Sequence, residues 1–421
     1  LESALAAASN GVGKSYYQFP ASNDYNAIPH DPKNILTKEK VELGKMLFHE
    51  TGIGQKPLVA ASLQTYSCAS CHHVKAGFQA CVPQGIGEGG LGFGVQGEKR
   101  DTDPTYDIKN IDVQQLRSPS ALNVAYQTNM LWNGQFGGTH VNAGTQASWT
   151  KGTPKEVNFK GFQGVETQAL AGREVHRLLI DKIFIENVSN YRDLYVKAFD
   201  EESLSDPVKL SDNGSLAIAA YERTLLATEA PFQQWLKGNY GALTQNQKEG
   251  AILFFGKAEC SKCHNGPSLA NMEFYGLGMG ELKNGKLGAN TVVGIVDSHP
   301  DHKGRGGFTG KAADMYKFKV PQLYNLKDSP FYGHGATFTS VKSVLDYKNN
   351  AIAENKVVPS SQLAKEFHPL NLSTVEIEKI SDFIVNGLYD ANLQRFVPKK
   401  LPSGLAFPNN DKITRKDLGF N

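Results

Sequence analysis

The sequence predicts an all-α fold in which one helical unit with long loops occurs twice. Two Cys-x-x-Cys-His motifs, at 68–72 and 260–264, are each preceded by an amphipathic segment of equal length, at 36–48 and 243–255. The 42 glycines and 19 prolines among 421 residues indicate many turns between the helices. Because further matching segments follow each motif in the same order, we predict that the two units are related by internal duplication.

Each unit is expected to open with a helix, at residues 36–48 and at residues 243–255. Both segments begin Leu-Thr, and a threonine before an apolar periodic run is a typical helix N-cap. Thr244 and Gln247 also have the spacing of a capping box. The apolar residues that helical periodicity places on the buried faces are Val41, Met46, Phe48, Ile252 and Phe255.

The Cys-x-x-Cys-His motif is compatible with three kinds of site. Half of a zinc site usually has its other ligands roughly a dozen residues away, and a thiol–disulfide redox pair has no need of the histidine. In a c-type haem site the cysteines attach the haem and the adjacent imidazole binds the iron. The histidine therefore predicts two covalently bound c-type haems. The attaching residues are Cys68, Cys71, Cys260 and Cys263, and the iron ligands are His72 and His264.

The loops after the two motifs also match. RSPSALN at 117–123 is echoed by FKVPQLYN at 318–325, and WNG at 132–134 by YGHG at 332–335. Several matches in the same order are a poor fit to chance similarity, so we interpret them as traces of a duplication.

A closing helix is expected at the end of each unit. Helical periodicity predicts one from Ser215 and a second from Ser373, where Glu376 completes a capping box. The order of helix, haem motif, loop, proline turn and closing helix describes a small cytochrome c domain. We therefore expect two cytochrome c-like domains, at residues 28–240 and 241–400.

Charge and hydropathy exclude several classes of protein. With 44 basic and 42 acidic residues and a net charge of +2, nothing indicates a nucleic-acid surface. No apolar run reaches the roughly 18 residues of a membrane span. Covalent haem is attached outside the bacterial cytoplasm, and residues 1–11 lack the basic start and apolar core of a signal peptide. We therefore expect a periplasmic protein whose N-terminus is a mature end.

Two features lie outside the haem motifs. Cys81 is a fifth cysteine, which we expect to be a buried or partly buried free thiol. The glycine-rich stretch Gly85–Gly97 has no strand-to-helix context for a nucleotide phosphate, so we interpret it as a flexible surface loop. It contains no His, Met or Lys that could bind iron.

Taken in order, these motifs resemble those of bacterial dihaem cytochrome c peroxidases and the related MauG-type enzymes. The likeness covers roughly residues 28–395. Besides the two haem motifs, it includes IPHDPKNILTKEKVELGKMLF from residue 28, SPSALNVAYQTNMLWNG from 118, YRDLYVKAF from 191 and YERTLLATEAPFQQWLKG from 221. Each segment alone is a weak signal, but their order is specific.

The resemblance implies a division of labour between the haems. The N-terminal haem would react with peroxide, and the C-terminal haem would take in electrons and store an oxidising equivalent. In the cytochrome c peroxidases of the family a histidine on the loop after the first haem blocks that iron until reduction opens it, whereas the iron of the MauG-type enzymes is open. The corresponding loop here is the His-free Gly85–Gly97 stretch, and we expect His73 to point elsewhere. The first haem should therefore be open in every redox state.

The resemblance also implies which residues take part in the reaction. Cleavage of the O–O bond needs a group that moves a proton between the two oxygens. Family spacing back from Tyr191 places this group at Glu174, and Gln168 occupies a place similar to that of the family's pocket glutamine. His176 is the alternative, either sharing the role of Glu174 or binding the iron as a distal ligand. Trp132 resembles the tryptophan between the haems and is expected to relay electrons.

The sixth ligand of the second haem departs from the family pattern. The family has Met there, or Tyr in the MauG group, but this chain reads LDYKNNA, and the alignment allows Tyr347 or Lys348. A phenolate suits ferric iron, whereas a lysine amine must first lose its proton through desolvation. We favour Tyr347, then Lys348, then Met279. The asparagine that holds calcium in the family is replaced by Arg117, which argues against a bound calcium.

The motifs and the resemblance together leave three hypotheses for function. The first is a peroxidase that reduces hydrogen peroxide to water with electrons from a small cytochrome c or copper protein. The second is a MauG-like oxidase that uses peroxide to modify a partner protein through high-valent iron. The third is a non-catalytic dihaem electron carrier. We favour the first hypothesis. The resemblance also implies that two copies of the chain can form a homodimer.

Overall fold

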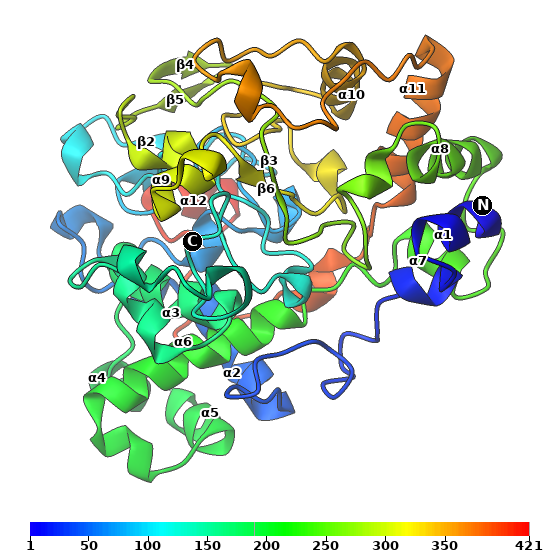
Figure 1. The fold of residues 1–421 in the computed structure, drawn as a ribbon. Helices are drawn as coiled ribbons and strands as arrows, with labels where there is room; N and C mark the ends of the chain where they lie inside the picture. The colour runs from blue at the N-terminus through cyan, green and yellow to red at the C-terminus, as the bar shows by residue number, and fades with distance from the viewer. Residues whose placement is uncertain (189, 421) are drawn as a thin grey trace.

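The computed structural model describes residues 1–188 and 190–420 and shows a mostly helical protein (Figure 1). Its α-helices are α1 (Glu2–Ala8), α2 (Lys38–His49), α3 (Gly164–Val175), α4 (Lys182–Asn187), α5 (Tyr191–Ala198), α6 (Pro207–Arg223), α7 (Pro231–Leu236), α8 (Gln245–Phe255), α9 (Arg305–Thr309), α10 (Val341–Asn350), α11 (Thr374–Asp382) and α12 (Lys412–Asp417). Short antiparallel ribbons join β1 (Gly90–Leu91) to β2 (Asp101–Thr102), β3 (Phe274–Tyr275) to β6 (Phe318–Lys319) and β4 (Gly285–Leu287) to β5 (Asn290–Val292). The expected helical fold is therefore correct in its main feature, and the ribbons are an addition to it.

Two helix pairs support the two haem motifs. α2 packs against α6, and α8 packs against α11. In both pairs a glycine lies where the helices cross. A Cβ on Gly44 would lie 1.8 Å from the carbonyl oxygen of Ala217, and one on Gly250 would lie 2.0 Å from that of Lys379. Because no side chain fits at these distances, the paired helices approach closely in both halves.

The capping signals in the sequence are confirmed. The side chain of Thr37 caps α2, and Thr244 forms a capping box with Gln247 at the start of α8. Ser373 and Glu376 form the capping box of α11. Each of these caps satisfies backbone N–H groups that a helix leaves free at its first turn.

α6 is longer than the hydrophobic pattern predicts. It begins at Pro207 and not at Ser215, because the side chain of Asp206 accepts hydrogen bonds from the N–H groups of Val208 and Lys209. Proline is favoured in the first turn, where its missing N–H costs nothing. The polar residues of this added stretch hide the true start from an analysis of apolar periodicity.

The buried faces of the opening helices agree with the prediction in part. Phe48 and Phe255 are buried, and Val41 and Met46 are half-buried. Ile252 was expected on the buried face but is 43% exposed. That expectation is wrong because the crossing at glycine turns a different side of α8 toward α11.

The two halves meet through a reciprocal pair of hydrogen bonds. The backbone N–H of Arg117 donates to the carbonyl of His334 (2.9 Å), and that of Lys319 donates to the carbonyl of Trp132 (2.7 Å). Arg117 and Lys319 each precede one of the matching proline turns, whereas Trp132 and His334 lie in the matching WNG and YGHG loops. The proline turn of each half is thus joined to the loop of the other half.

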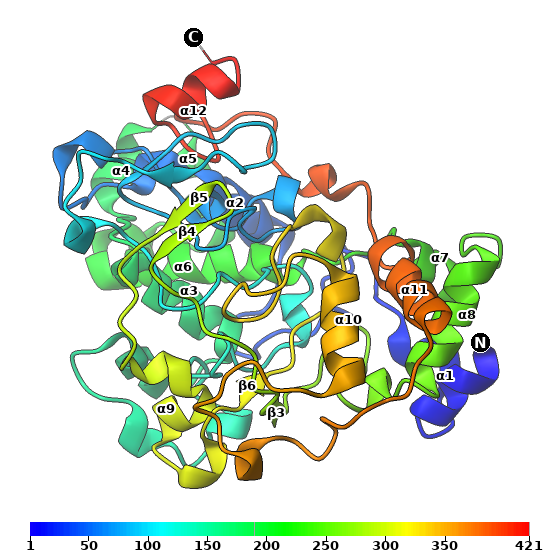
Figure 2. The ribbon, with the colours of Figure 1, turned by 90° about the horizontal axis from the view of Figure 1, so that it is seen from above.

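The terminal segments cross over between the halves (Figure 2). Near the N-terminus, the ring of Tyr17 packs on Phe255 of α8, with 5.0 Å between centroids. Near the C-terminus, the carbonyl of Pro408 accepts hydrogen bonds from the hydroxyls of Ser67 and Ser70, both at 3.2 Å. The first segment therefore covers the second half, and the last segment covers the first haem motif.

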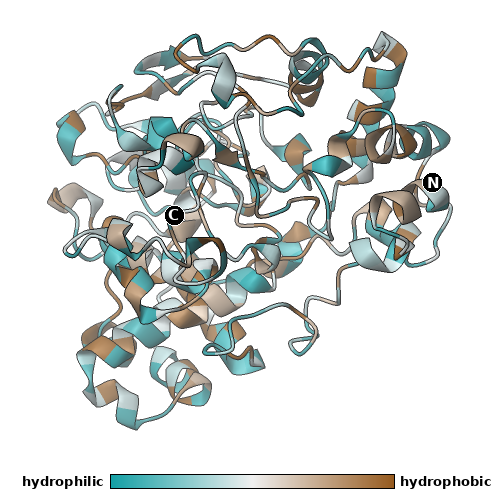
Figure 3. Ribbon diagram, in the orientation of Figure 1, coloured by the Kyte–Doolittle hydropathy of each residue, from teal (hydrophilic) through white to brown (hydrophobic). Residues whose placement is uncertain are grey.

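One large apolar cluster extends through both halves. It includes Leu43 and Leu47 of α2, Phe254 of α8 and Ile380 of α11. Figure 3 shows apolar and polar residues sharing individual helices, as expected of helices that bury one face. No helix among the described residues combines the length and the apolar character that a membrane crossing requires.

Candidate active site

The two Cys-x-x-Cys-His motifs have the same backbone geometry. A short 3₁₀ turn begins at each first cysteine. The N–H of His72 donates to the carbonyl of Cys68 (3.1 Å), and that of His264 donates to the carbonyl of Cys260 (2.8 Å). The cysteines of both motifs are free thiols. Each turn therefore places its two thiols and its imidazole together, which is what covalent haem attachment requires.

The two motif histidines are held in the form that binds a metal. Nδ1 of His264 lies 3.0 Å from the carbonyl of Leu269, and Nδ1 of His72 lies 3.4 Å from that of Phe78. A proton on Nδ1 that donates to a carbonyl leaves the lone pair of Nε2 free for iron. Burial lowers the pKa of each imidazole to about 4, so both are neutral at physiological pH.

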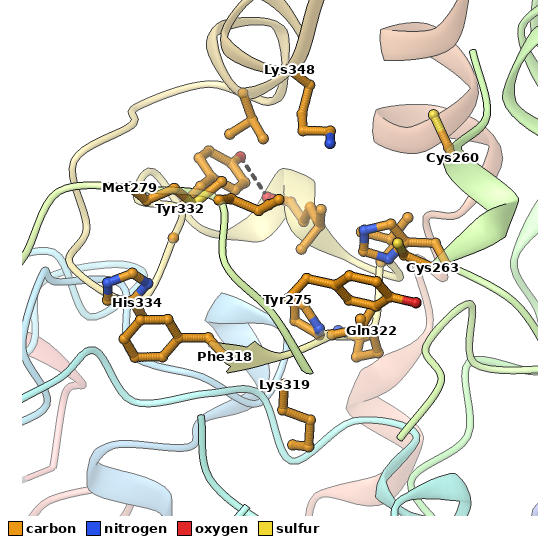
Figure 4. A pocket seen from close by; sticks show the side chains of 18 of the residues that line it. Cys260, Cys263, Tyr275, Met279, Phe318, Lys319, Gln322, Tyr332, His334 and Lys348 are labelled. Atoms are coloured by element: carbon orange, nitrogen blue, oxygen red, sulfur yellow. Dashed lines mark hydrogen bonds between the residues drawn. The ribbon is translucent and has the colours of Figure 1, made fainter. Parts of the chain in front are cut away.

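A cavity of about 260 Å³ adjoins the second motif. It is lined by Cys260, Cys263 and His264, together with mainly apolar side chains (Figure 4). Two free thiols and a neutral imidazole at the wall of an apolar cavity fit a covalently attached haem. Lys348 and Met279 also line this cavity.

Tyr347 does not lie where the sequence analysis placed it. Its hydroxyl donates to the carbonyl of Leu277 (2.6 Å), and its ring packs between Phe338 and Phe367. It is not among the residues that line the cavity. The preference for Tyr347 as the sixth ligand is therefore corrected, because its side chain packs in a separate aromatic cluster and its hydroxyl is hydrogen-bonded there.

Lys348, the next residue along α10, does face the cavity. Its Nζ lies 3.2 Å from the carbonyl of Glu366, and burial lowers the pKa of this amine. Burial also lowers the pKa of His264, and the positive charge of Lys348 adds to that effect. The amine is thus close to the imidazole, and its surroundings favour the neutral form that can bind iron.

At the first motif, His176 is one of the charged or titratable groups near His72. Its Nδ1 lies 2.8 Å from Oδ2 of Asp112, a carboxylate that is 5% exposed. Burial tends to lower the pKa of His176, but the Asp112 carboxylate outweighs it and raises the pKa overall. Burial lowers the pKa of His72, and the charge of nearby His176 lowers it further.

Glu174 does not face this site. Its side chain is 63% exposed and forms an ion pair with Arg173 at 3.2 Å. α3 ends at Val175, and the residue that turns inward beyond that end is His176. Gln168, in contrast, borders Gly172, as His176 does. A Cβ on Gly172 would be 3.4 Å from Nε2 of Gln168 and 3.8 Å from Cδ2 of His176. Gln168 and His176 thus both border Gly172, whereas Glu174 faces solvent.

The glycine-rich stretch Gly85–Gly97 is not the surface loop that we expected, since most of it is buried. A Cβ on Gly85 would lie 2.9 Å from Sγ of Cys71, and one on Gly87 would lie 2.3 Å from Oδ2 of Asp112. The glycines therefore allow the backbone to pack directly against the first motif and against the partner of His176. Buried Arg100 holds the loop in place by donating to the carbonyls of Ile86 and Gly87, both at 2.8 Å.

Cys81 and His73 lie close to the first motif. Cys81 is a buried free thiol, as predicted. His73 is buried and packs on Phe93, with 5.0 Å between ring centroids.

Trp132 lies at the junction of the two halves. Its Nε1 donates to the carbonyl of Arg117 (2.8 Å), and its ring lies 6.1 Å from that of His334. Nη1 of Arg117 donates in turn to Oε1 of Gln79 (2.8 Å), on the segment after the first motif. Trp132 and Arg117 both line the cavity of the second motif. Within the described residues, no cluster of three or more His, Cys, Asp or Glu side chains could hold a metal ion.

Asp112 and Lys319, a residue that lines the cavity of the second motif, were not predicted from the sequence as site residues. Asp112 belongs to no motif and is 64 positions from His176, so no local signal could have found it. Lys319 could have been found, because the echo of RSPSALN by FKVPQLYN aligns it with Arg117.

The chain is similar to known proteins over most of its length. Residues 38–241 match the family model described as di-haem cytochrome c peroxidase. The chain is 27% identical to methylamine utilization protein MauG of Methylorubrum extorquens over 361 residues, which are 85% of this chain and 80% of that protein. It is 26% identical to cytochrome-c peroxidase IdrP1 of Pseudomonas sp. strain SCT over 386 residues, 85% of this chain and 83% of that protein.

A solved structure shows the same fold. The crystal structure of a MauG-like protein associated with microbial copper homeostasis superimposes with a TM-score of 0.58 at 20% identity. The match covers 90% of this chain and 96% of the other.

Proposed function

The chain belongs to the family of dihaem cytochrome c peroxidases and MauG proteins, and we propose that it reduces hydrogen peroxide to water with electrons from a small redox protein. The observation that carries this proposal is the His176–Asp112 pair beside His72. A pure electron carrier has no use for such a pair, because it moves no proton between substrate atoms.

Members of this family carry two c-type haems, and the residues present fit them. The first would be held by Cys68, Cys71 and His72, and the second by Cys260, Cys263 and His264. A haem iron with one open position supplies a binding site for a peroxide oxygen and the capacity to exchange single electrons.

His176 is the group that moves the proton in our proposal. With its proton on Nδ1 and directed at Asp112, Nε2 has a free lone pair. Nε2 can accept a proton from the near oxygen of hydrogen peroxide and return it to the far oxygen, which then leaves as water. Asp112 keeps the ring oriented and stabilises the imidazolium between the two transfers. We propose the same site for Gln168, which borders Gly172 as His176 does and would offer an amide to the bound peroxide.

For the second haem we propose Lys348 as the sixth ligand. It faces the cavity near His264, and burial lowers the pKa of its amine, as a ligand that must be neutral requires. Met279 also lines the cavity and is the alternative thioether ligand. Held by both His264 and Lys348, the second haem would be suited to electron transfer, which would leave the peroxide chemistry to the first.

We propose that Trp132, which lines the cavity of the second motif, relays electrons between the two haems. An indole between the two sites would shorten the electron-transfer steps. We place the protein in the periplasm, where the electron donor would be a small cytochrome c or copper protein. A second copy of the chain, forming a homodimer, is a further partner in this proposal.

We also infer that the two halves arose by duplication, with units at residues 28–240 and 241–400. The support comes from features that recur at equivalent places in both halves. These are the glycine at each helix crossing, the reciprocal bonds of Arg117 and Lys319, and a left-handed asparagine after each proline turn, Asn123 (φ 61°) and Asn325 (φ 55°).

The test of function is steady-state turnover of peroxide with a reduced cytochrome c or a reduced copper protein. We expect saturable, peroxide-dependent oxidation of the donor that is lost in His176→Gln. Peroxide consumption that oxidises no small donor but modifies a partner protein would instead indicate a MauG-like oxidase. A protein that exchanges electrons but does not react with peroxide would be a carrier, and the proposal would fail.

A further inference from the structure

Two buried cations line the cavity of the second haem without an acidic partner. Arg117 is 4% exposed and Lys319 is 7% exposed, and both belong to the cavity wall. Arg117 donates to Oε1 of Gln79, to a backbone carbonyl and to the hydroxyl of Ser329. Nζ of Lys319 donates to Oε1 of Gln127. All of these acceptors are neutral, and no carboxylate in the described part of the chain pairs with either cation.

Such charges are costly to bury unless something compensates them. Burial lowers the pKa of Lys319 to about 7 and that of Arg117 to about 10. Nε of Arg117 is buried and has no hydrogen-bond partner among the residues that the structure describes. Buried charges in native proteins are normally paired, because an unpaired ion loses its hydration without replacement. The two cations therefore point to an anion that binds in the cavity.

The two cations occupy equivalent places in the two halves. Arg117 stands two positions before Pro119, and Lys319 stands two positions before Pro321. The backbone of Pro119 lies near His72, and that of Pro321 lies near His264. Each half thus contributes one cation, placed by its own haem-binding turn, to one shared cavity.

We propose that Arg117 and Lys319 bind the carboxylate groups of the second haem. The propionates of a c-type haem are anions that enter this cavity with the cofactor, and they match the cations in sign. Charge-assisted hydrogen bonds from guanidinium and ammonium groups to carboxylates are among the strongest in proteins. Lys348 lies on the opposite side of the pocket from Lys319 (Figure 4). The two lysines can therefore have different roles, with Lys348 as the proposed sixth ligand. The inference depends on the two haems and not on the peroxide chemistry.

The test measures the reduction potential of the second haem in the holoprotein with Lys319→Met. Loss of a positive charge beside a haem favours its ferric form. We expect at least a tenfold change in the reduction equilibrium, a fall of 59 mV for a one-electron couple. Lys319→Arg keeps the charge and should restore the parent potential. Lys317→Met is the matched control, because Lys317 is half-buried on the same segment but does not line the cavity.

A parent-like potential in Lys319→Met would overturn the assignment and leave the turnover of peroxide, and so the proposed function, as it was. A parent potential that changes with chloride concentration would also overturn it, because a free anion would then be the partner. If Lys319→Met yields no folded protein, Arg117→Gln serves for the same measurement, with Arg117→Lys as its charge-preserving counterpart.

Discussion

Replacement of His176 by glutamine tests the proposed proton transfer directly. Glutamine fills a similar volume and can still face Asp112, but it cannot accept a proton. General acid–base groups contribute about 10²–10⁴-fold to a rate. At about 1.36 kcal/mol per tenfold, this is about 2.7–5.4 kcal/mol of lost transition-state stabilisation. The reaction of His176→Gln with peroxide should therefore be slower by two to four orders of magnitude.

Glu174→Gln is the matched control, two positions away on the same segment. The side chain of Glu174 is 63% exposed and forms an ion pair with Arg173. An exposed ion pair contributes at most about 1 kcal/mol, which is about fivefold in a rate or an equilibrium. The variant should therefore react with peroxide within about fivefold of the parent rate.

Stopped-flow mixing with peroxide, followed by the first change in haem absorption, measures both rates. The haem content of each variant, from the mass of the intact protein, shows whether both cofactors are still attached. A parent-like rate in His176→Gln would refute the role of His176. A fall of more than tenfold in the peroxide reaction rate of Glu174→Gln would indicate that Glu174 is the proton-transfer group.

The remaining predictions concern the second haem and the buried charges. Lys348→Met should change the absorption and magnetic spectra of the second haem to those of a haem with histidine and methionine ligands. Tyr347→Phe should leave these spectra unchanged. Unchanged spectra in Lys348→Met would exclude Lys348 as the sixth ligand. Arg223→Met should lower the free energy of unfolding by about 3–5 kcal/mol, because it strands the fully buried carboxylate of Glu166, and denaturant titration measures this loss. Burial raises the pKa of Glu222 from 4.5 to about 8. Its protonated form therefore stabilises the fold fully below pH 4.5, and this contribution declines as the pH rises to about 8. The melting temperature of Glu222→Gln relative to that of the parent should therefore be higher at pH 9 than at pH 5. An equal difference between the two proteins at both pH values would contradict this.

Features decided by neighbouring residues were predictable from the sequence. The caps at Thr244 and Ser373 are completed three positions later, by Gln247 and Glu376, so spacing alone reveals them. Each haem motif is likewise contained in five consecutive residues, and its turn is closed by a hydrogen bond within it. Such local signals also place the supporting helices of the two halves in their correct order.

Features decided by rotation about a helix were not predictable. A step of one residue turns a side chain by about 100°, because an α-helix has 3.6 residues per turn. The alignment could not separate Tyr347 from Lys348, and only the packing of α10 shows which one faces the cavity. Glu174 and His176 differ by two positions, and the end of α3 at Val175 decides which of them turns inward.

The glycine-rich loop shows why a site can depend on a segment far along the chain. Oδ1 of Asp411 accepts a hydrogen bond from the N–H of Gly92 (3.1 Å), and Oδ2 pairs with buried Arg100 at 3.4 Å. Arg100 in turn holds the carbonyl of Gly87, where the loop packs against the carboxylate that orients the proposed proton-transfer group. Residues 401–420 lie beyond both expected units, yet Asp411 among them hydrogen-bonds the glycine-rich loop that packs against the first haem motif. A fragment ending at residue 240 would contain the first haem motif but not these contacts, so the first site is completed only by the full chain.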